Sequence, residues 1–130
     1  MGLTTFDETA AEVWSWLLVP ASGTGFIALV PTDVFDRRVD SILVSNRDGI
    51  AHVINLSLIV GSSRTQLGSV SVPAGAGYAG TPSVDILPTS LPATQVGLVV
   101  PGNYALNFNV SVAVVATFDM SVTAFGGRVQ

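Results

Sequence analysis

Residues 104–114, YALNFNVSVAV, alternate between apolar and small or polar side chains more clearly than any other stretch of this chain. One set of alternate positions is apolar and consists of Tyr104, Leu106, Phe108, Val110, Val112 and Val114. The positions between them are small or polar and consist of Ala105, Asn107, Asn109, Ser111 and Ala113. Side chains of a β-strand point alternately to opposite faces of its sheet, so this pattern predicts a strand with one face in a core.

Shorter stretches of the same kind recur along the chain, with turn-forming residues between them. The expected strands are residues 26–30, 39–46, 51–60, 66–72, 83–87, 96–100, 104–114 and 118–125. Asp48-Gly49 is a strong hairpin signal between two of them. Many short strands without helical periodicity predict an all-β protein, an antiparallel two-sheet sandwich. Jelly-roll and immunoglobulin-like strand orders both remain open.

The N-terminal residues have a different character from the rest of the chain. We expect residues 1–25 to form a short arm or helix and residues 26–130 to form the β-sandwich domain. A Thr-x-x-Glu capping-box pattern and shared apolar positions favour a helix within residues 5–18. An extended segment with Trp14 and Trp16 on one side fits equally well. In both cases a tryptophan is available for contact with a partner.

The chain carries unusually little charge. Its 130 residues have a formal net charge of −4, contain neither Lys nor Cys, and are 11% charged, against about 25% in an average globular protein. An acidic chain with scattered arginines lacks the basic face that nucleic-acid binding needs, and the absence of Cys excludes thiol chemistry. No apolar run approaches the ~20 residues that span a bilayer, so we expect no membrane partner. A neutral surface rich in Ser, Thr, Asn and Gln favours contact with other proteins.

A glycine-rich stretch matches a nucleotide-binding motif in form only. Gly75-x-Gly77-x-x-Gly80 has the spacing of the dinucleotide-binding fingerprint. That fingerprint needs a following helix whose N-terminus holds the pyrophosphate, whereas Thr81-Pro82 and a further strand follow here. We therefore expect the glycines to form a long connection that crosses from one sheet to the other.

Few side chains are candidates for catalysis. His52 is the only histidine and begins a predicted strand on its apolar side, so we expect a hydrogen-bonded structural histidine. Asp33, Asp36 and Asp40 lack the alternating ligand pattern of a calcium loop, and neighbouring arginines favour ion pairing at a surface corner. These residues predict a protein without catalytic residues, metal ligands or cofactor.

Three segments between Val39 and Gly127 carry a resemblance to a known class of protein. They are ILVSNRDGIAHVINLSLIVG at residues 42–61, LGSVSVPAGAGYAGTPSVDIL at residues 67–87, and PGNYALNFNVSVAVVATFDMSVTAFGG at residues 101–127. This part of the chain resembles small β-sandwich proteins encoded among the virion genes of tailed bacteriophages. The resemblance implies a structural component of the phage particle, assembled in the host cytoplasm, and carries over no catalytic residue.

The resemblance and the composition together lead to one functional hypothesis with two alternatives. We expect a non-enzymatic capsid decoration (cement) protein that binds neighbouring subunits of the major capsid protein, or other virion proteins, and associates with itself as a dimer or trimer. The alternatives are a neck or tail component of the virion and, in another class, a carbohydrate-binding β-sandwich module. The candidate partner-contacting residues are Trp14, Trp16, Tyr78, Asn107, Asn109 and Ser111.

Overall fold

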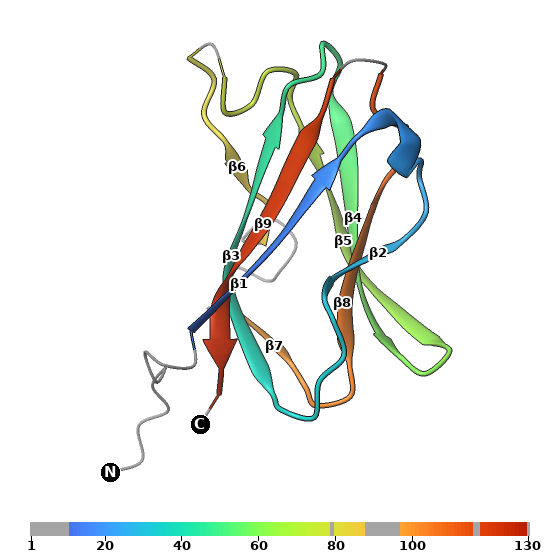
Figure 1. Ribbon diagram of the computed structural model, residues 1–130, viewed down its shortest axis with the longest axis vertical. Helices are drawn as coiled ribbons and strands as arrows, with labels where there is room; N and C mark the ends of the chain where they lie inside the picture. The colour runs from blue at the N-terminus through green and yellow to red at the C-terminus, as the bar shows by residue number, and fades with distance from the viewer. Residues whose placement is uncertain (1–10, 79, 88–96, 116–117, 130) are drawn as a thin grey trace.

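A computed structural model describes residues 11–78, 80–87, 97–115 and 118–129 and shows two antiparallel β-sheets packed face to face (Figure 1). The predicted all-β two-sheet sandwich is therefore confirmed. The strands are β1 (Ala11–Leu18), β2 (Ile27–Val30), β3 (Arg37–Asn46), β4 (His52–Val60), β5 (Ser63–Val72), β6 (Val84–Asp85), β7 (Leu98–Val100), β8 (Ala105–Val110) and β9 (Met120–Arg128). A 3-10 turn, η2 (Pro20–Ser22), follows β1.

The strand order is that of a jelly roll. Sheet A has the order β1-β9-β3-β6, with β7 also paired to β3, and sheet B has the order β2-β8-β4-β5. The chain forms one long hairpin that turns at Gly61, and its two arms pair along their length. From the turn outward, β4 pairs with β5, β3 with β6 and β7, β2 with β8, and β1 with β9. The pairings of β9 with β3 and β8 with β4 roll this hairpin into two sheets.

The core lies between the sheets, where the alternating positions predicted it. Leu106, Phe108 and Val110 of β8 are fully or almost fully buried, and Phe108 lies opposite Leu56 of β4. The largest apolar side chains that are fully buried include Leu18, Ile42, Ile54, Leu56, Ile86, Leu106, Phe108 and Met120. One apolar cluster therefore joins both sheets, and it supplies the main hydrophobic stabilisation of the fold.

Strand β8 ends earlier than the alternation predicts. It stops at Val110, and Val112 is 57% exposed, so the predicted core position of Val112 is wrong. The backbone after β8 is bound by side chains from another segment. The carbonyl oxygen of Val112 lies 3.0 Å from His52 Nδ1, and the N–H of Val115 donates to Asp48 at 2.9 Å. These two bonds draw the chain away from the sheet.

The region expected to be a separate arm is, from Ala11 onward, part of the sandwich. Residues 11–18 form β1, which pairs with β9 along its whole length, from Ala11 opposite Gly127 to Leu18 opposite Met120. Of the two alternatives for this segment, the structure has the extended one; the capping-box residues lie outside the described residues. The physical reason is pairing with β9, which satisfies the backbone of an extended segment along its whole length. In this strand Trp14, which packs against the core, and Leu18, which is buried, lie on the same face.

The glycine-rich stretch connects the two sheets, as predicted. It joins β5 of sheet B to β6 of sheet A. Gly75, Gly77 and Gly80 have φ values of 74°, 84° and 84°, which L side chains rarely adopt. The N–H of Gly77 donates to the carbonyl oxygen of Thr81 at 2.7 Å, and a Cβ at Gly77 would also crowd Ser45. The glycines therefore shape a tight loop.

Candidate interaction surface

Strand β1 forms one edge of sheet A and exposes several large apolar side chains. Its free edge has no strand partner among the described residues, since β1 pairs with β9 alone. Val13 and Leu17 point outward and are 62% and 57% exposed. Exposed apolar side chains on a sheet edge are a common feature of protein interaction sites.

The apolar character continues across the outer face of sheet A. Val13 lies opposite Phe125 of β9, and Leu43 of β3 lies opposite Thr123 of β9. We call the outward-facing residues of segments 13–17, 41–45 and 121–125 the sheet A face. The three segments contain no charged residue. Covering this face requires no desolvation of an ion.

Charged groups border the sheet A face along β3. Arg38 lies 2.9 Å from Asp40 at one end of β3, and Asp85 of β6 lies opposite Leu43. The pair of Glu12 and Arg128, 3.5 Å apart, lies on the other side of β1 and β9, the side on which Trp14 lies. An apolar centre with charged groups at its margin is the usual composition of a protein–protein interface. Sequence reasoning missed this face. The available signal was the run Ile42-Leu43-Val44, which breaks the alternation and must leave its middle residue outside the core.

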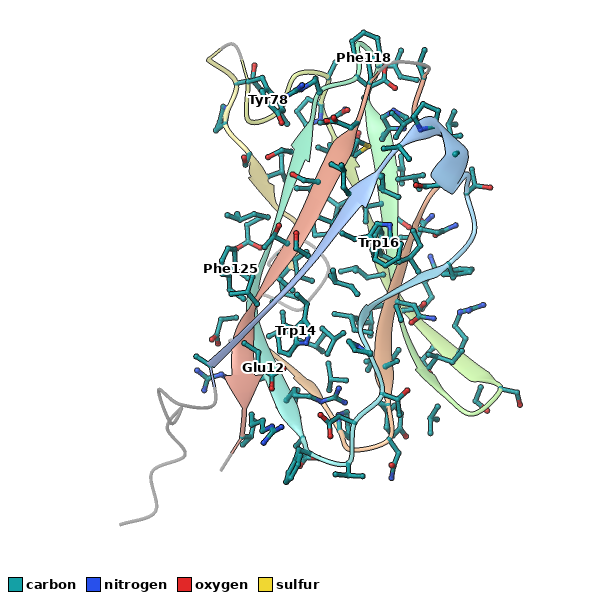
Figure 2. The ribbon with its side chains drawn as sticks, in the orientation of Figure 1. Glu12, Trp14, Trp16, Tyr78, Phe118 and Phe125 are labelled. Atoms are coloured by element: carbon teal, nitrogen blue, oxygen red, sulfur yellow. The ribbon has the colours of Figure 1, made fainter. Side chains whose placement is uncertain are left out.

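The two predicted tryptophans lie on the opposite side of β1 from this face. Figure 2 shows Trp14 and Trp16 on the side of β1 that faces sheet B, with Phe125 on the outer side of sheet A. Trp14 is half-buried and packs against the core, whereas Trp16 remains exposed beside the open edge of the sandwich. Of the two, Trp16 therefore has the ring surface available for contact.

The predicted row on β8 lies on the outer face of sheet B and is largely engaged within the chain. Asn55 donates to Asn109 Oδ1 at 3.0 Å and to Ser111 Oγ at 3.3 Å, and it accepts from Ser69 Oγ at 2.6 Å. Asn109 in turn donates to the carbonyl oxygen of Thr24 at 3.0 Å. These bonds link β5, β4, β8 and the segment before β2. The amide of Asn109 is therefore a structural cross-link.

Asn107, on the same face, is only 8% exposed and is not available for contact. Phe26 precedes β2 and Arg64 lies on β5, at opposite edges of sheet B. The Arg64 guanidinium nevertheless lies 3.7 Å from the centre of the Phe26 ring. The two side chains therefore meet above the middle strands, β8 and β4. There they cover the outer face of sheet B where Asn107 and the buried Ser57 lie opposite each other.

Tyr78 lies at the end of the sandwich where the loops cluster, near Phe118 in the view of Figure 2. Its ring is partly exposed and is covered on one face by the Arg47 guanidinium, 4.8 Å from the ring centre. Arg47 also lies 3.7 Å from Asp119. One face of the Tyr78 ring is therefore covered by Arg47, and the ring lies away from the sheet A face.

His52 is a buried, hydrogen-bonded histidine, as predicted. Its Nε2 lies 2.8 Å from Asp48 Oδ2 and its Nδ1 lies 3.0 Å from the carbonyl oxygen of Val112. Both ring nitrogens are thus engaged, and no free nitrogen faces solvent. Burial alone would raise the pKa of Asp48, but hydrogen bonds from the Val115 N–H, from His52 and from the Gly49 N–H outweigh it and hold this pKa below its ordinary value.

The acidic corner agrees with the prediction only in part. Arg38 and Asp40 form the expected ion pair, whereas Asp33 and Asp36 accept backbone N–H groups, of Phe35 at 3.4 Å and of Gly102 at 2.7 Å. Arg37 is 1% exposed and has no carboxylate partner among the described residues. Its guanidinium donates to the carbonyl oxygens of Pro31, of Pro101 at 3.3 Å and of Tyr104 at 2.9 Å. Arg37 therefore closes one end of the core. Within the described ranges, no group of His, Asp or Glu side chains has the arrangement of a metal site.

Comparisons with known proteins add no further assignment. No protein-family model, no curated protein and no solved structure matches this chain. In the part of the chain that the structure describes, no helix is long and apolar enough to cross a membrane.

Proposed function

We propose that this protein is a non-enzymatic structural component of a tailed-bacteriophage particle, a capsid decoration protein that binds and stabilises neighbouring capsid subunits. The observation that carries the proposal is the sheet A face, which exposes Val13, Leu17, Leu43 and Phe125 among uncharged Ser and Thr side chains. The partner is the major capsid protein or another virion protein.

The energetics of the sheet A face suit attachment to a protein lattice. Fully burying a Val, Leu or Phe side chain contributes about 1.5–3 kcal/mol, and each of these side chains is already partly covered in the free chain. A few such contacts, less the cost of immobilising the protein, give moderate affinity per copy. A protein that bridges two capsid subunits binds only the assembled form and therefore stabilises it. Because many copies bind to one capsid, moderate affinity per copy is enough to stabilise the whole shell.

The resemblance to virion proteins supports the same proposal. Of the three strands that form the sheet A face, β9 falls almost entirely within segment 101–127 and the second half of β3, residues 42–46, falls within segment 42–61. Strand β1 lies outside those segments. The compact jelly roll supplies a rigid body on which such a face keeps its shape.

The experiment is to purify particles of the phage that encodes this chain and to measure its copy number relative to the major capsid protein. A decoration protein is present in fixed proportion to the capsid subunit, and the recombinant protein rebinds to particles from which it was stripped. A few copies per particle without rebinding to the shell would instead indicate a neck or tail component. Absence from purified particles would contradict both.

The carbohydrate-binding alternative has weaker support from the aromatic side chains. Sugar-binding sandwiches use neighbouring exposed aromatic rings as platforms. Here Phe26, Phe35 and Tyr78 each carry an arginine guanidinium over the ring, at 3.7, 4.4 and 4.8 Å from its centre. The other exposed rings of the described residues, Trp16, Phe118 and Phe125, lie at separate places on the molecule (Figure 2). A sugar would have to displace a cation–π contact at each of the three arginine-covered rings. Specific binding to immobilised polysaccharides would favour this alternative.

A further inference from the structure

Strand β1 is the one edge in the described part of the sandwich that has no feature preventing pairing with another strand. Proteins protect edges by shortness, bulges, prolines or charges. Strands β6 and β7 have only 2 and 3 residues, β2 has 4 residues and a register shift, and β5 has a register shift where it pairs with β4. Strand β1 has 8 residues in unbroken register with β9.

The residue types of β1 also do not prevent pairing with another strand. It contains no Lys and no Pro, and its one charged residue, Glu12, lies near the start of the strand. Glu12 is turned toward Arg128 of the neighbouring strand at 3.5 Å. The remaining six residues, from Val13 to Leu18, are uncharged. The backbone N–H and C=O groups on this edge, which pair with no strand of the described residues, can therefore accept a further strand.

The sequence of β1 is nearly symmetric about its centre. Val13-Trp14-Ser15-Trp16-Leu17 reads as apolar, Trp, Ser, Trp, apolar in both directions. In an antiparallel pair of two β1 strands centred on Ser15, Val13 lies opposite Leu17 of the second copy and Trp14 lies opposite Trp16 of the second copy. Two-fold symmetry makes each pair twice, and such self-complementarity is the requirement for a closed dimer.

We propose that two copies of this chain associate through β1, antiparallel and centred on Ser15, so that both A sheets form one continuous sheet. Like charges do not oppose the association, because the two Glu12 side chains lie at opposite ends of the paired strands, about 20 Å apart. The pairing buries the exposed Trp16 and joins the two sheet A faces side by side. It does not depend on the proposed function, since it concerns the isolated chain.

The first test measures association of the full chain by sedimentation equilibrium over a wide range of protein concentrations. We expect a monomer–dimer equilibrium. Val13→Glu and Leu17→Lys should each raise the dissociation constant by about tenfold or more, because symmetry introduces each change twice. Val99→Glu, at an exposed valine on the opposite edge of sheet A, is the matched control and should leave the equilibrium unchanged.

The double variant Val13→Glu/Leu17→Lys tests the register. In the proposed pairing, each introduced carboxylate lies opposite an introduced ammonium of the second copy, so dimerisation should recover toward the unmodified level. Within one copy the two positions are about 13 Å apart along the strand, too far for a direct ion pair. Recovery in the double variant is therefore specific to the antiparallel arrangement centred on Ser15.

Tryptophan fluorescence provides an independent readout. The chain has 2 tryptophans, both on β1, so all indole emission comes from the proposed interface. Emission should shift to longer wavelength on dilution, as Trp16 returns to water. A chain that is monomeric at every concentration overturns the proposal, as does failure of the double variant to recover. If β1 variants of a monomeric chain instead abolish particle attachment, the edge pairs with a particle protein and self-association is wrong.

Discussion

His52 and Asp48 form a buried pair, with 2.8 Å between His52 Nε2 and Asp48 Oδ2. The pair connects three segments: the turn after β3, the start of β4 and the chain that follows β8. The third segment is bound through the carbonyl oxygen of Val112 and the N–H of Val115. Because the pair is out of water, loss of either member leaves a buried polar group without its partner.

Replacement of His52 should destabilise the protein in a way that depends on the new side chain. His52→Leu leaves the Asp48 carboxylate without its side-chain partner and should lower the free energy of unfolding by about 3–5 kcal/mol. His52→Gln retains an N–H donor and should cost about 1–3 kcal/mol. Urea denaturation at neutral pH measures both. Equal effects of the two variants would show that the His52 hydrogen bonds contribute little.

Stability should also depend on pH through Asp48. The pKa of Asp48 is lower in the folded protein than its ordinary value, so the folded state favours the ionised carboxylate. The resulting stabilisation is fully present above the ordinary aspartate pKa of about 3.9 and is lost as the pH falls through the lower, folded-state pKa. The difference in unfolding free energy between the unmodified chain and Asp48→Asn should therefore be constant at neutral pH and shrink in strong acid. A difference that does not change with pH would contradict this.

The central position of β8 allows a direct test of the core. Phe108 is fully buried between the sheets, and Phe108→Ala should reduce the free energy of unfolding by about 3–5 kcal/mol. Val99→Ala, at an exposed position of β7, is the control and should change it by no more than about 0.5 kcal/mol. Chemical denaturation followed by circular dichroism compares them. A small effect of Phe108→Ala would mean that the core repacks.

Gly126 should tolerate no side chain. It pairs with Val39 next to the register shift in the β3–β9 pairing, and a Cβ there would overlap the carbonyl oxygen of Arg38. Gly126→Ala should destabilise the protein by about 1–3 kcal/mol or more, because the obstacle is backbone rather than a movable side chain. Gly49→Ala is the control, since no atom lies within 4 Å of its added Cβ. Equal melting temperatures of the two variants would contradict the close approach.

The sequence predicted the strands better than it predicted their ends and their order. Alternation correctly identified Leu106 and Phe108 as core residues because side-chain direction in a strand follows from local geometry alone. The end of β8 depends on His52 and Asp48, which are distant in sequence, so local pattern could not locate it. The strand order likewise depends on pairings between distant segments such as β1 and β9.

The interaction residues were harder to predict for a related reason. Asn107 is small, polar and on the outer side of β8, yet Phe26 and Arg64 meet over its face of sheet B. Arg37 has a charge that suggests the surface, but carbonyl oxygens from separate loops bind it in the interior. In both cases the decisive partners come from other parts of the chain, and a single sequence contains no local signal for them.

The sheet A face can be tested separately from the β1 edge. Leu43 lies on β3, separated from β1 by the intervening strand β9 and thus about 10 Å from it. Leu43→Arg places a charge on the uncharged face at its border with β6, where Asp85 lies opposite residue 43. Attachment to the capsid would have to desolvate this charge. We expect unchanged folding, an unchanged monomer–dimer equilibrium and at least a tenfold loss of attachment to purified particles, which corresponds to about 1.4 kcal/mol.

Val34→Arg is the matched control, because Val34 is 75% exposed and lies in the loop before β3, outside the sheet A face. It should attach to particles like the unmodified chain. Attachment is measured by co-sedimentation with particles from which the native protein has been removed, after circular dichroism has shown that both variants fold. If Leu43→Arg attaches as well as Val34→Arg, the sheet A face is ordinary solvent surface. Contact with the capsid would then have to come from another region, such as the loop end of the sandwich that carries Tyr78.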